Sequence, residues 1–256
     1  MDTDLEILLT NDDGIDSPGF RALHDALSEV ANVVAVAPAD DQSAVGRTMS
    51  NEVSVEDHEL GFAIGGTPVD CIVAGLEALG PAPDLVVSGC NTGANLGAYV
   101  LGRSGTVSAA VEAAFCGVPA IAVSLHIPEE EWPREPAVEE YAEACRATRH
   151  LVELAPVRGV FEHADYLNVN APIAGEEPAP MRVTRPSTVY EMAATQDGDS
   201  ITLRDLTWET LGAGEVDDPE GTDRRAIADG EVSVSPLTAP HTTEHHEALD
   251  RLADEY

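Results

Sequence analysis

Short apolar runs alternate with amphipathic segments from the start of the chain. Residues 5–10, LEILLT, form an apolar run that stops at a polar Asn-Asp-Asp-Gly turn, the pattern of a buried strand. Ser17 and Pro18 then open a segment with apolar side chains at helical spacing, and a second apolar run covers 33–37. Strand, helix and strand in succession form a βαβ unit, which predicts a parallel sheet.

The same alternation continues to residue 172. It predicts a hairpin near 51–65, helices at 68–79, 106–117 and 137–154, and strands at 84–89, 118–125 and 166–172. Alternating strands and helices of this kind are typical of an α/β fold with a Rossmann-like, three-layer, doubly wound and mainly parallel sheet. In such sheets ligands bind at the carboxyl ends of the strands.

After residue 172 the pattern changes to turns rich in Pro, Gly and Asp between short segments that alternate in the β period. We therefore expect a catalytic core at 1–172, a β-hairpin arm at 173–230, and a returning strand with a C-terminal tail helix at 231–256. An isolated hairpin cannot bury its own apolar face, which favours a contact between subunits of a homo-oligomer.

The charge balance changes this picture most. The chain has 47 acidic and 13 basic residues, a net charge of −34, and every basic residue is Arg. Nucleic-acid duplexes and anionic membranes attract basic surfaces, so we expect neither as a partner. The charges must lie on a folded surface, where concentrated salt would screen their repulsion. We expect a halophilic protein of a high-salt cytoplasm; a GC-rich genome explains the missing Lys but not the acidic excess.

Other features are less informative. The chain has no apolar stretch long enough to span a membrane, and its acidic start lacks the features of a signal peptide, which favours a cytoplasmic location. The four cysteines are scattered, which predicts small buried apolar residues: Cys71, Cys90, Cys116 and Cys145. Three histidines have spacing that could bind a transition metal on a helix, although a solvated tail is the favoured interpretation: His241, His245 and His246.

Oxygen-rich segments follow the predicted strands. Asp12 and Asp13 come directly after the first strand, and hard cations such as Mg²⁺ or Mn²⁺ prefer such ligands. Ser43 lies in the polar loop after the second strand, and Asn91 and Asn95 lie in a glycine-spaced loop after the third predicted core strand. Taken singly, each has a plain alternative: an acidic turn, a polar loop, or an ordinary Asn-Gly turn.

A possible anion site lies at the start of the alanine-rich helix. Ser104, Gly105 and Thr106 offer hydroxyls and free backbone N–H groups there, although an ordinary N-cap would explain the same residues. Metal ligands and a phosphate site at the ends of neighbouring strands together indicate a phosphoester bound to a metal, with a metal-activated water as nucleophile.

Two other phosphoryl-transfer classes also place acidic residues after a first strand. Aspartyl-phosphate phosphatases need a second Asp two residues after the nucleophile, but Gly14 stands there for Asp12. Phosphoryl-receiver modules need a Lys on a later strand, and this chain contains no Lys. The sequence therefore disfavours both classes.

Several segments in order resemble the SurE survival-protein family of nucleotidases. They are ILLTNDDGIDSPGFRAL, VAPADDQSAVG, GTPVDC, DLVVSGCNTGANLG, SGTVSAAVEAA, YLNVNAP and GTDRRAIADGEVSVSPL, and they span most of the chain. The resemblance implies a Rossmann-like core, a β-hairpin arm, and a C-terminal segment exchanged between subunits of a homodimer or homotetramer.

The resemblance also implies metal-dependent removal of phosphate from nucleoside 5′- and 3′-monophosphates, and sometimes from short polyphosphate. One divalent cation per subunit, Mg²⁺ or Mn²⁺, is expected on these four ligands: Asp12, Asp13, Ser43 and Asn91. The implied phosphate contacts are Asn11, Asn95, Ser104, Gly105 and Thr106. Asp12 or Asp13 would accept the proton of the attacking water.

One departure and one alternative accompany this expectation. Asp41 precedes Ser43 where many family members are basic, which would weaken the attraction of an anionic substrate. A nucleotide sensor that binds at the same site without turnover is the alternative.

The surface charge predicts that stability depends on salt. Between about 1 M and 0.1 M salt the Debye length grows from about 3 Å to about 10 Å, so repulsion between acidic groups increases. We expect the melting temperature to fall by about 5 °C or more, equivalent to roughly 2 kcal/mol for a chain of this size. Circular-dichroism melts across a KCl series measure this, and an unchanged melting temperature at low salt would remove the halophilic interpretation.

Overall fold

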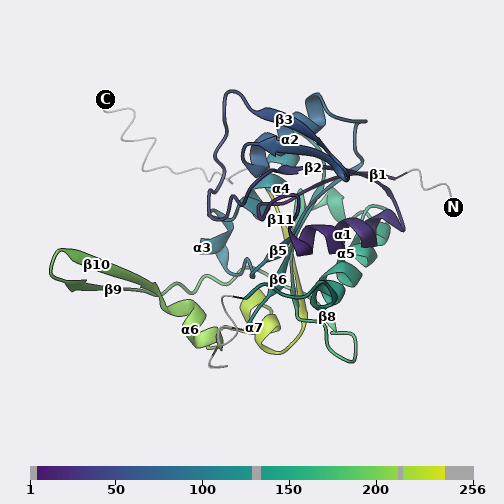
Figure 1. The fold of residues 1–256 in the computed structure, drawn as a ribbon. Helices are drawn as coiled ribbons and strands as arrows, with labels where there is room; N and C mark the ends of the chain where they lie inside the picture. The colour runs from purple at the N-terminus through teal and green to yellow at the C-terminus, as the bar shows by residue number, and fades with distance from the viewer. Residues whose placement is uncertain (1–4, 129–133, 213–215, 240–256) are drawn as a thin grey trace, which may run out of the picture.

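The computed structural model describes residues 5–128, 134–212 and 216–239. A nine-stranded sheet, in the order β3-β4-β2-β1-β5-β6-β7-β11-β8, forms its centre (Figure 1). Its strands are β1 (Glu6–Thr10), β2 (Asn32–Pro38), β3 (Ser54–His58), β4 (Gly61–Gly65), β5 (Leu85–Thr92), β6 (Ala120–His126), β7 (Tyr166–Pro172), β8 (Met181–Val183) and β11 (Val232–Leu237).

The six neighbouring strands from β4 to β7 run parallel, whereas β3 and β11 pair antiparallel with β4 and β7. The chain leaves β1 toward β2 on one side and later places β5 on the other side of β1. This reversal is the topological switch point of a doubly wound sheet, where a ligand crevice is expected. The predicted Rossmann-like α/β fold is confirmed.

Helices cover both faces of the sheet because its central strands are apolar on both sides. Ile7 and Leu9 face a core shared with α1 and α5, whereas Leu8 between them faces a core shared with α2 and α4. The helices are α1 (Pro18–Ser28), α2 (Pro68–Glu77), α3 (Ala98–Leu101), α4 (Gly105–Phe115) and α5 (Ala142–Leu154), with the 3₁₀ turns η2 (Val138–Tyr141) and η3 (Val160–Glu162).

The predicted helix starts are confirmed with two differences. Thr67 and Asp70 form a capping box at α2. Ser17 occupies the N-cap position of α1, but its hydroxyl makes no capping bond and instead accepts a hydrogen bond of 2.9 Å from the Asn11 amide. The helix predicted at 137–154 begins as the 3₁₀ turn η2 and continues as α5.

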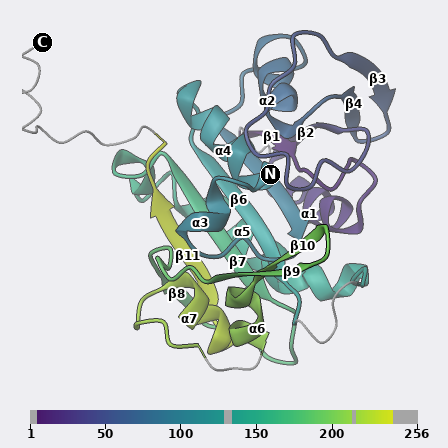
Figure 2. The same cartoon turned by 90° about the vertical axis from the view of Figure 1, so that its left-hand side faces the viewer.

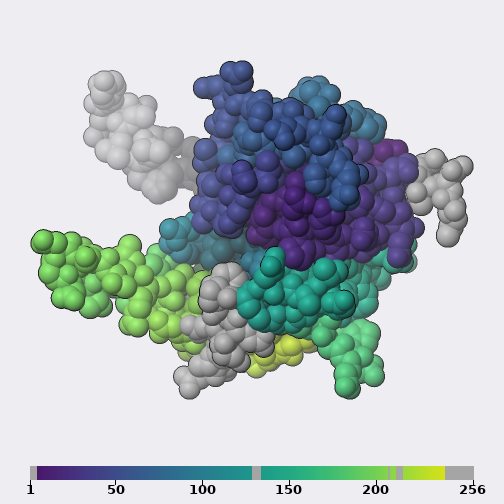
Figure 3. Space-filling view, viewed as in Figure 1, coloured from purple at the N-terminus to yellow at the C-terminus, as the bar shows by residue number. Residues whose placement is uncertain are grey.

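The arm contains both the predicted hairpin and two helices that its alternating pattern did not predict. Strands β9 (Met192–Asp197) and β10 (Ser200–Asp205) form a separate antiparallel hairpin that projects from the body (Figure 3). The helices are α6 (Leu206–Gly212) and α7 (Asp223–Ala228), which lie near each other in Figure 2. Since β8 pairs with β11 in the main sheet, part of 173–230 joins the core, and the domain boundaries stay a prediction.

Other predictions have mixed outcomes. The returning strand is confirmed as β11, whereas the tail helix and the three C-terminal histidines lie outside the described residues. Three cysteines are buried as predicted, but the prediction was wrong for Cys116, which is exposed because α4 ends there at the surface. In the described part of the chain, no helix is both long and apolar enough to cross a membrane.

Gly19 sets the distance between α1 and β5. An added Cβ would lie 2.2 Å from the Cys90 carbonyl oxygen and 2.7 Å from Cε1 of Tyr141. Gly19→Ala should therefore lower the free energy of unfolding by about 1–3 kcal/mol, as overfilling of a core does. Gly102→Ala is the matched control, because a Cβ there meets no atom within 4 Å. Equal denaturation midpoints for the two variants would contradict this account.

Candidate active site

A cavity of about 620 Å³ opens at the carboxyl ends of the central strands. Five of the residues predicted from the sequence line it together: Asp12, Ser43, Asn91, Asn95 and Ser104. The four other predicted residues are absent from its lining: Asn11, Asp13, Gly105 and Thr106. The structure therefore gathers the predicted residues at the switch point but divides them between the wall of the cavity and its support.

Asp12 is buried, with 3% of its surface exposed. Its Oδ1 accepts a hydrogen bond of 2.5 Å from the Thr106 hydroxyl. A Cβ on Gly105 would lie 2.8 Å from Asp12 Oδ2, so α4 approaches this carboxylate closely only because residue 105 is glycine. Gly105 and Thr106 thus hold Asp12 in place.

Asp13 is partly buried, and its Oδ2 accepts a hydrogen bond of 2.7 Å from the Thr92 backbone N–H. Burial, followed by the charge of Asp12, raises the pKa of Asp13 to about 7. Burial also raises the pKa of Asp12, against the lowering effect of its hydrogen bonds from Thr106. Two adjacent carboxyls with raised pKa values fit a site whose charge is balanced by a cation.

The described side chains supply little positive charge to balance the two carboxylates. Within residues 5–128, 134–212 and 216–239, no Arg or His forms an ion pair with Asp12 or Asp13. The same residues contain no cluster of three or more His, Cys, Asp or Glu side chains suited to a metal. A cation here would therefore need neutral oxygen ligands beside the two carboxylates.

Asn91 and Ser43 are the neutral candidates. The Asn91 amide nitrogen donates to the Gly93 carbonyl, which leaves Oδ1 as the side-chain atom available to a cation. Ser43 is exposed, and both its backbone N–H and its hydroxyl donate to Asp41 Oδ1, at 2.8 Å and 2.6 Å. Asp41 therefore holds the hydroxyl that was predicted as a ligand.

Asn95 is fixed by side chains from β6 and β7. Its backbone N–H donates to Asn170 Oδ1 over 2.8 Å, and its side-chain amide donates to Ser124 Oγ over 2.9 Å. Its carbonyl oxygen accepts from the side-chain amides of Asn168 and Asn170. These three supporting residues were not predicted, although polar residues inside the apolar strands at 118–125 and 166–172 were a signal for them.

Asn11 and Ser104 have clear local roles. The Asn11 amide nitrogen donates to the Gly14 carbonyl over 2.7 Å and to Ser17, so it holds the turn between β1 and α1. Ser104 Oγ accepts from the Val107 backbone N–H and caps α4. The N-terminus of α4 thus faces the cavity, where its dipole favours an anion. Phosphate contacts of Asn11 and Ser104 stay predictions.

Sequence reasoning missed the outer lining of the cavity. Its members are Tyr99, Val100, Arg103, His126, Ile127, Asp205, Trp208 and Leu211. His126 lies at the carboxyl end of β6, where the strand-end rule would have found it. Asp205, Trp208 and Leu211 come from the arm, and no local pattern in the sequence indicates that the arm reaches the cavity.

Comparisons with known proteins identify the family of the chain. A family model described as Survival protein SurE matches residues 7–192. The chain is 64% identical to the 5′-nucleotidase SurE of Halobacterium salinarum over all of both chains, and 64% identical to that of Haloarcula marismortui over 98% of this chain and 94% of the relative. The crystal structure of the SurE protein from Aquifex aeolicus superposes with a TM-score of 0.80 at 32% identity, covering 97% of this chain and 99% of that one. The chain belongs to the SurE family.

Proposed function

We propose that this chain is a divalent-metal-dependent phosphohydrolase that removes phosphate from nucleoside 5′- and 3′-monophosphates. One observation carries the proposal: two adjacent carboxylates, without a cationic partner among the described residues, lie beside the N-terminus of α4 at the switch point of the sheet. The name 5′-nucleotidase carried by the two relatives supports the substrate class.

Asp12, Asp13, Asn91 and Ser43 are the residues that would hold the cation, Mg²⁺ or Mn²⁺, one per subunit. When bound, such a cation supplies a Lewis acid that polarises a phosphoryl group and makes a water molecule more acidic. For Ser43 to serve, its hydroxyl would keep donating to Asp41 while its oxygen lone pair faces the cation.

The protein residues then position the substrate and accept a proton. We assign contacts with the phosphate oxygens to the N-terminus of α4 and to the second hydrogen of the Asn95 side-chain amide, which also donates to Ser124. Asp12 or Asp13 accepts the proton of the attacking water. The hydrogen bonds from Thr106 and Thr92 hold Asp12 and Asp13 in fixed positions, which lowers the cost of reaching the transition state.

We further propose a homodimer or homotetramer in a high-salt cytoplasm. The projecting hairpin supports the oligomer, because Ile201 and Leu203 on β10 are 63% and 70% exposed and would be covered by a second subunit. The net charge of −34 supports the high-salt location.

Phosphate release from a panel of 5′- and 3′-nucleoside monophosphates and short polyphosphate, at high salt, tests the activity. We expect release from the mononucleotides with Mg²⁺ or Mn²⁺, and loss of release with EDTA that is reversed by excess cation, because the two carboxylates need a counter-charge. Release that persists in EDTA would contradict the metal dependence. Saturable nucleotide binding with no release under any condition would favour the sensor.

Replacement of one carboxylate tests the site directly. Asp13→Asn keeps the shape of the side chain but removes its charge and its ability to accept a proton, so kcat should fall about 10²- to 10⁴-fold at saturating metal. Asp57→Asn is the matched control, since Asp57 is exposed on β3 and away from the cavity lining. Full turnover by Asp13→Asn would exclude the proposed role of that residue.

A further inference from the structure

The cavity extends beyond the residues proposed to hold a cation and a phosphate. Its inner end is polar and contains Asp12, Asn91 and Asn95. Its outer part combines polar side chains with apolar and aromatic ones, among them Tyr99 of α3 and Trp208 of α6. These aromatic side chains would not stabilise a bound phosphate group. They would contact an aromatic ring carried by the phosphorylated molecule.

We propose that the outer part is a nucleoside subsite in which the base of the substrate stacks on the indole ring of Trp208. The inference rests on the proposed phosphohydrolase activity and adds to it the side chain that distinguishes nucleotides from small phosphate esters. Stacking on an aromatic side chain accepts any base, because every base has a π-face. The subsite therefore favours nucleoside monophosphates as a class.

Trp208 suits this role better than Tyr99. The Tyr99 ring already contacts Tyr190, with ring centroids 3.9 Å apart. Its hydroxyl accepts a hydrogen bond of 2.6 Å from Arg103, whose guanidinium also lies over the ring at 5.1 Å. In the described part of the chain no ring or guanidinium stacks on Trp208. Tyr99 is thus held by protein groups, and Trp208 is the aromatic side chain left to a ligand.

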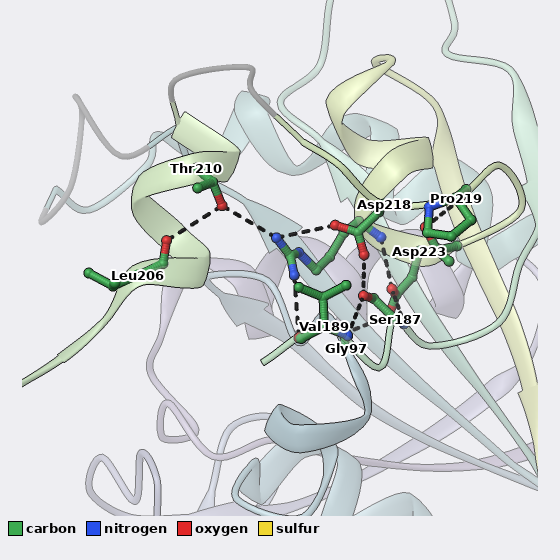
Figure 4. A network of polar contacts seen from close by, with 10 residues as sticks. Gly97, Ser187, Val189, Leu206, Thr210, Asp218, Pro219 and Asp223 are labelled. Carbon is green, nitrogen blue, oxygen red and sulfur yellow. Dashed lines mark hydrogen bonds and ion pairs between the residues drawn. The ribbon is translucent and has the colours of Figure 1, made fainter. Parts of the chain in front are cut away.

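Trp208 is partly buried, and part of its side chain packs against apolar residues. It contacts an apolar cluster that includes Leu96, Leu211 and Ile227. Figure 4 shows a polar network that includes Asp218 and Thr210. Arg224 forms an ion pair of 3.2 Å with Asp218. Arg224 also donates to the Thr210 hydroxyl of α6 over 3.5 Å. The helix that carries Trp208 therefore has apolar and polar contacts with residues outside the arm hairpin.

The same network reaches the phosphate end of the cavity. Asp223, next to Arg224, accepts hydrogen bonds from the backbone N–H groups of Gly97 and Ser187, at 2.7 Å and 2.8 Å (Figure 4). Gly97 follows Asn95 by two residues, so one buried network supports both the base wall and the phosphate loop. A nucleotide would meet a site whose two ends are already positioned, which reduces the ordering cost of binding.

Kinetics with and without a base test the subsite. Trp208→Ala should lower kcat/KM for adenosine 5′-monophosphate about tenfold or more, mainly through KM, and leave ribose 5-phosphate unchanged, because only the first substrate carries a base. Trp208→Phe should retain most of the activity on the nucleotide. Phe115→Ala is the matched control, since Phe115 is an exposed aromatic residue that lies outside the cavity lining. An equal loss on both substrates, or no loss on the nucleotide, would overturn the proposal.

A binding measurement keeps the inference separate from the hydrolase proposal. Trp132→Phe removes the only other tryptophan of the chain, so the remaining fluorescence reports on Trp208. Adenosine 5′-monophosphate should quench this fluorescence saturably, whereas ribose 5-phosphate should not. Quenching by the nucleotide without phosphate release would retain the subsite and reject the hydrolase. Absence of quenching, or equal quenching by both compounds, would reject the subsite.

Discussion

The site depends on the cost of holding two adjacent carboxylates, Asp12 and Asp13, at the end of β1. Each loses hydration there, and their mutual repulsion adds to the cost. The Thr106 hydroxyl, the Thr92 backbone N–H and the N-terminus of α4 offset part of it. They supply partial charges only, and the proposed divalent cation would complete the balance. In a turn with only a structural role, the rest of this free-energy cost would have no compensating interaction.

The topology decides what such a cation would meet. Strands β1 and β5 flank the switch point, and α4 begins beside them. The strand order therefore brings carboxylates, an amide oxygen and a helix N-terminus together. The arm then adds a wall of different chemistry, and Trp208 faces the same cavity as Asn95. In the proposed function, the core would bind the phosphate, and Trp208 and Leu211 of the arm would contact the rest of the substrate.

Patterns along the chain predicted the core because its elements obey local rules. The apolar runs became β1 and β2, the Thr67-Pro68 start became a capped helix, and the glycine-spaced loop placed Asn91 and Asn95 at the cavity. The arm could not be predicted in the same way. Short helices such as α6 owe their stability to tertiary contacts. Trp208 reaches the cavity by packing against Leu96 and Ile227, which lie far from it in the sequence, and no periodicity reveals that proximity.

Anomalous diffraction from a crystal soaked in Mn²⁺ is the measurement that tests the central claim most directly. The account predicts one strong manganese peak per subunit at the carboxyl ends of β1 and β5, within coordination distance of oxygen atoms of Asp12, Asp13 and Asn91. A fully occupied peak elsewhere, or no peak at this site at millimolar manganese with both carboxylates ordered, would contradict it.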